Sequence, residues 1–81
     1  MNTISKIEEI KETFASYVGR RVHVTVKKGR KMRFARKGVI ENVYPNIFVV
    51  KLEPRGEEGE RRVSFSYADI LTRVVEVLVF K

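Results

Sequence analysis

The chain has 81 residues, of which 43% are apolar, and its 17 Lys and Arg against 10 Asp and Glu give a net charge of +7. This length is enough for one folded domain with a single core. The longest apolar runs, IFVV and VLVF, are too short to span a bilayer, and early charges argue against a signal peptide. The absence of cysteine excludes disulfides and thiolate metal sites, and it fits a cytoplasmic protein of bacterial type.

Residues 1–18 predict one amphipathic helix with a single apolar stripe. Ser5 and Glu8 fit a capping box, and Gly19 suits the left-handed residue that ends a helix. A lone helix of this length is marginal in water, so we expect its stripe to dock on the rest of the chain. The stripe, with apolar residues at spacings of three and four, consists of Ile4, Ile7, Ile10, Phe14 and Val18.

After Gly19 the apolar period changes from 3.6 to 2, which predicts strands. Arg36 falls on the same side as the apolar residues of the second strand, so we expect a bulge near Arg36-Lys37-Gly38. Turns are expected at KKGR and at Tyr44-Pro45-Asn46, and PRGEEGE (54–60) reads as a polar loop. Val63 and Phe65 mark the fourth strand, and VVEVLVF marks the fifth. The inward residues predicted for the first three strands are Val22, Val24, Val26, Met32, Phe34, Ile40, Phe48, Val50 and Leu52.

Five short strands, with a one-turn break at SYADIL before the last, predict a mainly β fold. The order matches a small five-stranded SH3-like barrel with the N-terminal amphipathic α-helix packed on it. We expect a single domain overall, with the helix at residues 1–18 and the barrel at residues 19–81. Strands three and five are apolar on both faces, so the helix is expected to cover their outer faces.

The excess positive charge lies in the middle of the chain. Residues 19–52 carry ten Lys or Arg against Glu41 alone, and no acid occurs from Thr13 to Ile40. Such concentration suits an anionic partner, through steering and counterion release, although a merely solvated cationic surface has the same pattern. The residues proposed to contact an anion are Lys27, Lys28, Arg30, Lys31, Arg33, Arg36 and Lys37, extended by Arg20 and Arg21.

The sequence contains few residues of the kinds that act in catalysis. His23, the single histidine, is predicted at an outward strand position and reads as a surface residue, with no further ligands spaced for a metal. Asp69 follows Ser66 by three residues, which is typical of a helix cap. Ser64 has no neighbouring base, and the glycines match no phosphate-binding loop. We therefore expect no enzyme activity and no cofactor.

Aromatic residues for stacking on bases are fewer than the basic ones. Tyr44 and Tyr67 lie at turn edges, where each ring either packs inward or faces a ligand. The predicted helix is slightly acidic, which argues against a recognition helix in the major groove. The pattern therefore favours contact with anions over reading of base sequence.

Two segments, ENVYPNIFVVKL and RRVSFSYADILTRVVEV, resemble the Veg family, small proteins of Gram-positive bacteria. The resemblance runs from about Ile4 to Val77, and it implies a non-enzymatic regulator that stimulates biofilm formation through control of gene expression. It brings no catalytic residues. The matching features are Gly19-Arg20-Arg21, Gly29-Arg30-Lys31, Gly38-Val39-Ile40, Tyr44-Pro45, Phe48-Val49 and Ser64–Thr72 with its Tyr67-Ala68-Asp69-Ile70-Leu71 core.

Two hypotheses about function follow. The first is a cytoplasmic regulator whose basic hairpin contacts nucleic acid or an acidic protein surface. The second is a protein–protein adaptor that binds a transcriptional regulator through the helix or through an outer sheet face carrying Ile47, Val49, Val74 and Leu78. Neither involves a membrane, and the sequence leaves the oligomeric state open.

Overall fold

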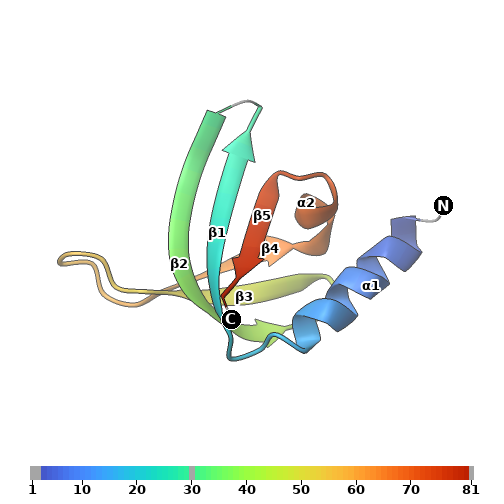
Figure 1. Cartoon of the computed structure of the whole chain (residues 1–81), viewed down its shortest axis with the longest axis horizontal. Helices are drawn as coiled ribbons and strands as arrows, with labels where there is room; N and C mark the ends of the chain where they lie inside the picture. Colours follow the sequence, from blue (N-terminus) through green and yellow to red (C-terminus); the bar gives the residue numbers. More distant parts are fainter. Residues whose placement is uncertain (1–2, 30, 81) are drawn as a thin grey trace.

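The computed structural model describes residues 3–29 and 31–80, and for residues 3–7, 28 and 32 it describes only the backbone. In these residues one antiparallel sheet has the strand order β4-β3-β2-β1-β5. One helix precedes the sheet and a short one stands before its last strand (Figure 1). The elements are α1 (Thr3–Ala15), β1 (Arg21–Lys28), β2 (Lys31–Val43), β3 (Ile47–Leu52), β4 (Arg61–Ser66), α2 (Tyr67–Leu71) and β5 (Val75–Val79).

The predicted mainly β fold, with five strands after an N-terminal helix, is confirmed. The sheet bends strongly, so that β1 and β2 rise as a hairpin while β3 runs across their base (Figure 1). β4 and β5 are the two edge strands, and no ladder joins them within residues 3–29 and 31–80. The barrel is therefore an open one.

The core lies on the concave face and follows the predicted alternation. Val22 and Val24 of β1 and Phe48 and Val50 of β3 are completely buried, and Leu52 is 1% exposed. Burying one such side chain stabilises the folded chain by roughly 1.5–3 kcal/mol. The period-2 pattern of the sequence thus places these strands in the correct register toward the core.

The bulge predicted at Arg36-Lys37-Gly38 is wrong. Pairing with β1 is regular there, and the irregularities lie elsewhere on β2. Val26 faces Phe34 while Lys27 faces Met32, which leaves Arg33 as the extra residue. On the other side of the strand, Glu41 is skipped between the pairs Ile40–Val50 and Asn42–Val49. Arg36 consequently keeps its inward position, opposite the buried Val24.

Gly38 is the point where β2 and β3 approach most tightly on the core side. It pairs with Val22 on one strand and Leu52 on the other. A Cβ at this position would lie 2.6 Å from the Lys51 carbonyl oxygen and 2.9 Å from Val50 Cγ1. Glycine is therefore required here by the lack of space.

We predict that Gly38→Ala lowers the free energy of unfolding by about 1–3 kcal/mol, because the backbone of β3 has to shift. Gly59→Ala is the matched control, since a Cβ there meets nothing within 4 Å. Urea denaturation of both variants measures the difference. Equal stability of the two variants would show that β2 and β3 do not approach as closely as described.

The helix α1 docks on the core at one end of the sheet. The ring of Phe14 contacts Phe48 edge-on with centroids 4.7 Å apart, and it meets Tyr67 at 6.1 Å. The helix begins at Thr3, so the predicted cap at Ser5 lies inside it. After the following turn, Gly19 has the expected positive φ of 88° and donates its N–H to the Ile40 carbonyl at 2.8 Å.

The prediction that α1 covers the outer faces of β3 and β5 is wrong. Ile47 on β3 is 38% exposed and Leu78 on β5 is 67% exposed. Phe14 instead inserts from the end of the sheet beside α2, where Phe48 and Tyr67 offer aromatic surface. Aromatic edges and faces pair favourably beyond their buried area, which explains why the helix prefers this place.

We predict that Phe14→Ala costs about 3–5 kcal/mol, because it removes the only fully packed side chain that α1 contributes in the part described. Val18→Ala, at a 46% exposed position just after the helix, should stay within about 0.5 kcal/mol of the parent. Thermal unfolding by circular dichroism compares them. A Phe14→Ala protein that melts like the Val18→Ala protein would make α1 an accessory arm.

Candidate anion-binding surface

The basic stretch lies on the projecting β1–β2 hairpin. It covers the end of β1, the turn and the first half of β2, which rise above the rest of the sheet (Figure 1). Of the predicted contact residues, Arg30 lies outside the described residues, and for Lys28 only the backbone is described. The others are placed individually below.

Arg20 and Arg21 are not brought to the hairpin end. They stand at the opposite end of β1, about 23 Å away by the rise of an extended strand. Arg21 Nη2 bonds Glu53 Oε1 at 2.8 Å, and its guanidinium lies 5.8 Å from the ring centre of Phe80. Arg20 donates to the Phe80 carbonyl at 3.3 Å. Both serve contacts with the chain's own loop and C-terminal segment.

Lys27 and Arg36 also have partners within the chain. Lys27 Nζ lies 2.9 Å from Glu76 Oε1, an exposed pair between β1 and β5. Arg36 is more deeply placed, with its side chain only 12% exposed on the concave side. It donates from Nη1 to Glu58 Oε1 at 3.1 Å and from Nη2 to the Glu53 carbonyl at 2.9 Å. This forked contact fastens the 53–60 loop to β2.

Two acids of the loop between β3 and β4 form ion pairs with cations on these strands. Glu60 meets Lys51 at 3.2 Å, and Glu58 also approaches Arg61 at 3.8 Å. Exposed pairs of this kind stabilise by at most about 1 kcal/mol. Their main effect is to neutralise charge. With the exception of Glu57, each acid of the 53–60 loop forms an ion pair with a cation of the same chain.

Glu41 and Arg62 form the tightest exposed pair, with Arg62 Nε donating to Glu41 Oε2 at 2.6 Å. This hydrogen bond lowers the pKa of Glu41 and raises that of Arg62. Because the carboxyl pKa is lowered in the folded state, the pair's contribution is present above the ordinary carboxyl range. It is lost as the pH falls through the lowered value.

The two tyrosines proposed as aromatic contacts have different surroundings. Tyr67 is completely buried, with its ring stacked on Phe48 at 5.7 Å, so the prediction of a ligand-facing ring does not fit its position. Burial raises the pKa of Tyr67, and the backbone of Tyr44 opposes part of that rise. The Tyr44 N–H donates to the Ile47 carbonyl, and the buried Tyr67 hydroxyl has no hydrogen bond among the described residues. Tyr44 is 46% exposed, at the end of β2 away from the hairpin turn.

Three of the predicted cations remain exposed and uncommitted. Lys31, Arg33 and Lys37 make no ion pair or side-chain hydrogen bond within the described residues. Arg33 is the extra residue of the bulge in β2, and its side chain is exposed. The first half of β2 therefore presents unneutralised positive charge to solvent, and the hairpin sequence has no acid before Glu41.

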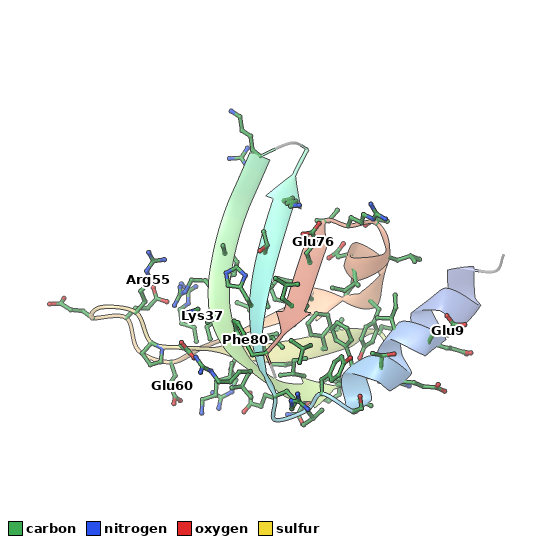
Figure 2. All side chains as sticks on the ribbon, in the orientation of Figure 1. Glu9, Lys37, Arg55, Glu60, Glu76 and Phe80 are labelled. Atoms are coloured by element: carbon green, nitrogen blue, oxygen red, sulfur yellow. The ribbon has the colours of Figure 1, made fainter. Side chains whose placement is uncertain are left out.

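An open groove of about 320 Å³ lies beside the hairpin, between the outer face of β1–β2 and the start of the 53–60 loop. Sequence reasoning missed this groove and its residue Arg55, because an isolated base in an acidic loop gives no pattern. Figure 2 shows Lys37 and Arg55 on the two sides of this region. The groove is lined by His23, Ala35, Arg36, Lys37, Glu53, Pro54 and Arg55.

Other kinds of site are not found in the described part of the chain. No three His, Asp or Glu side chains of residues 3–29 and 31–80 gather closely enough to hold a metal ion. Over the same residues, no helix has the length and apolar character needed to cross a membrane. The predicted Ser66-x-x-Asp69 cap is present, with Ser66 as the capping residue of α2, since the Asp69 backbone N–H donates to Ser66 Oγ at 3.1 Å.

Comparison with known protein families identifies the family to which the chain belongs. The model of the family described as "Biofilm formation stimulator VEG" matches residues 5–78. The chain belongs to the Veg family. This confirms the resemblance seen in the sequence, and membership implies a role in stimulating biofilm formation. A search of curated proteins finds no match.

We predict that Arg36→Ala lowers the free energy of unfolding by about 1.5–3 kcal/mol, because it removes two hydrogen bonds from a nearly buried guanidinium. Glu60→Gln breaks only the exposed pair with Lys51 and should cost less than about 1 kcal/mol. Urea denaturation distinguishes the two. Similar losses for both variants would mean that Arg36 does not anchor the loop.

Proposed function

We propose that this Veg-family protein is a cytoplasmic, non-enzymatic regulator that acts in biofilm formation through control of gene expression, with its β1–β2 hairpin contacting nucleic acid. One observation carries the nucleic-acid part of this proposal. The hairpin projects from the sheet, and Lys31, Arg33 and Lys37 remain without acidic partners among the described residues. Phosphate groups are the natural counter-charges for such a surface.

The contact is expected to read the backbone of the nucleic acid and not its bases. Among residues 3–29 and 31–80 no helix offers a basic face to enter a groove, since α1 carries acids and docks on the core. The surface consists of flexible cationic side chains on an extended ribbon, which suits contacts to phosphates. Affinity should therefore depend strongly on salt and weakly on sequence.

The adaptor hypothesis has less support. The four residues proposed for the adaptor contact fall into two groups, Ile47 with the half-buried Val49 on β3, and Val74 with Leu78 near β5. β2 and β1 lie between these strands in the sheet. These four residues therefore do not form one continuous patch, whereas a protein-binding patch is normally continuous.

We predict that the protein binds mixed-sequence DNA at low salt and that log K falls linearly with log salt. Lys31→Gln with Arg33→Gln should make the slope less negative by about 1.8 on duplex DNA, or about 1.4 on single strands. Lys11→Gln with Arg62→Gln removes the same net charge from α1 and the edge strand β4, and it should leave the slope unchanged. Fluorescence anisotropy over a salt series measures this.

Two outcomes would contradict the proposal. Absence of binding to both duplex and single-stranded DNA and RNA at low salt would eliminate direct nucleic-acid contact. Equal slopes for the two double variants would show that binding reflects net charge and not the hairpin. Capture of a protein regulator from nuclease-treated lysate, together with either result, would favour the adaptor.

A further inference from the structure

The groove beside the hairpin carries positive charge on both of its walls. Lys37 comes from β2, and Arg55 comes from the 53–60 loop (Figure 2). Neither side chain makes an ion pair or hydrogen bond in the described part of the chain. The acid that lines the groove, Glu53, is already bonded to Arg21 at 2.8 Å. Two cations therefore face one space without a counter-charge.

The walls of the groove are fixed to each other by the backbone. The N–H of Glu53 donates to the Lys37 carbonyl at 3.0 Å, so the loop starts as a continuation of the sheet. Arg55 and Glu58 form an isolated β-bridge, with the Glu58 N–H donating to the Arg55 carbonyl at 3.0 Å. The Glu58 carboxylate is in turn held by Arg36. The position of Arg55 is thus set by the folded chain before any ligand binds.

A hydrogen-bonding group completes the site. His23 pairs directly with Lys37 across the β1–β2 ladder, and its side chain lies in the groove wall on the same outer face. A guanidinium offers a fork of N–H donors, an ammonium offers a compact charge, and an imidazole adds one more N–H. This set of donors suits an anion with several oxygens, and phosphate is the one that arginine forks and lysine together bind most readily.

We infer that this groove is a phosphate-binding subsite, with Lys37 and Arg55 as its cations and His23 as an additional donor. The inference rests on the proposed function, since the phosphate is assigned to the backbone of the nucleic acid that the hairpin contacts. The subsite gives the interface a second anchor, away from the hairpin turn.

The spacing along β2 fits one continuous strand of nucleic acid. Lys31 and Lys37 are six residues apart on β2, and because the bulge at Arg33 takes up one step, they lie about 17 Å apart along the strand. At about 3.4 Å per nucleotide along a duplex, this distance is covered by roughly five base steps. The register places Lys31 on the face of Val26 and Lys37 on the face of His23, and β3 pairs with β2 only from Gly38 onward. A DNA of about twelve nucleotides that runs along the edge of β2 can therefore contact the hairpin end and the groove together.

The test compares two double variants, Lys37→Gln/Arg55→Gln in the groove and the control Lys11→Gln/Arg62→Gln, in the full chain and with DNA of about twelve nucleotides. Loss of two phosphate contacts should make the salt slope less negative by about 1.8 on duplex, or about 1.4 on single strands, in the groove variant only. Arg55→Lys, in an otherwise unchanged chain, should keep most of the parental slope because it retains the charge. Circular dichroism confirms that each variant is folded.

The failures of the two proposals are distinguishable. If Lys31→Gln with Arg33→Gln changes the slope and the groove variant does not, the subsite is refuted while the hairpin function stands. If neither variant matters, both are refuted. Polyglutamate is the control for anion chemistry: if it competes as well as DNA of equal charge, the groove accepts carboxylates and the assignment to phosphate is overturned.

Discussion

The forked contact of Arg36 organises the charged half of this protein. Its guanidinium lies nearly buried on the concave face and bonds both the Glu58 carboxylate and the Glu53 carbonyl. A charge in this position needs a partner, because an unpaired buried ion is costly. The 53–60 loop supplies that partner, and in doing so it is held beside β2. Together with the backbone hydrogen bonds from Glu53 to Lys37 and from Glu58 to Arg55, this interaction sets the shape of the groove.

The 53–60 loop also determines which cations of the chain are neutralised. Its acids satisfy cations at the base of the hairpin and on β3 and β4, as in the pairs Glu53–Arg21 and Glu60–Lys51. At the turn end of the hairpin and in the groove, cations remain without acidic partners among the described residues. The part of the net charge of +7 that Lys31, Arg33, Lys37 and Arg55 carry is thereby left exposed at the hairpin and the groove. Such a local surface can select where an anionic partner binds.

The sequence predicts the strands well because their signal is local. Alternation places Val22, Val24, Phe48 and Val50 on the buried face, and the structure agrees for each. A period of two is fixed by the geometry of a strand, and a slip by one residue would expose the whole apolar set. Family membership was likewise visible in contiguous segments.

Features that depend on distant residues were not predictable in this way. The inward Arg36 suggested a bulge, because its partner Glu58 lies 22 positions further along the chain and gives no local signal. The docking of α1 depends on aromatic surface contributed by Phe48 and Tyr67, which meet only in the folded state. Tyr67 was ambiguous because the sequence does not show how fully α1 and α2 enclose a turn-edge ring.

The central claim is that the turn end of the hairpin, with Lys31 and Arg33, and the neighbouring groove, with Lys37 and Arg55, both bind phosphate groups of one nucleic acid. Backbone amide shifts in ¹⁵N-labelled protein, followed during titration with DNA of about twelve nucleotides, test it most directly. We expect perturbation along β2 from Lys31 to Lys37 and at the amides of Glu53 and Arg55, with α1 and the Ile47–Val49 segment unaffected. Shifts centred on Ile47 and Val49, or on Leu78 of β5, with β2 silent, would contradict it.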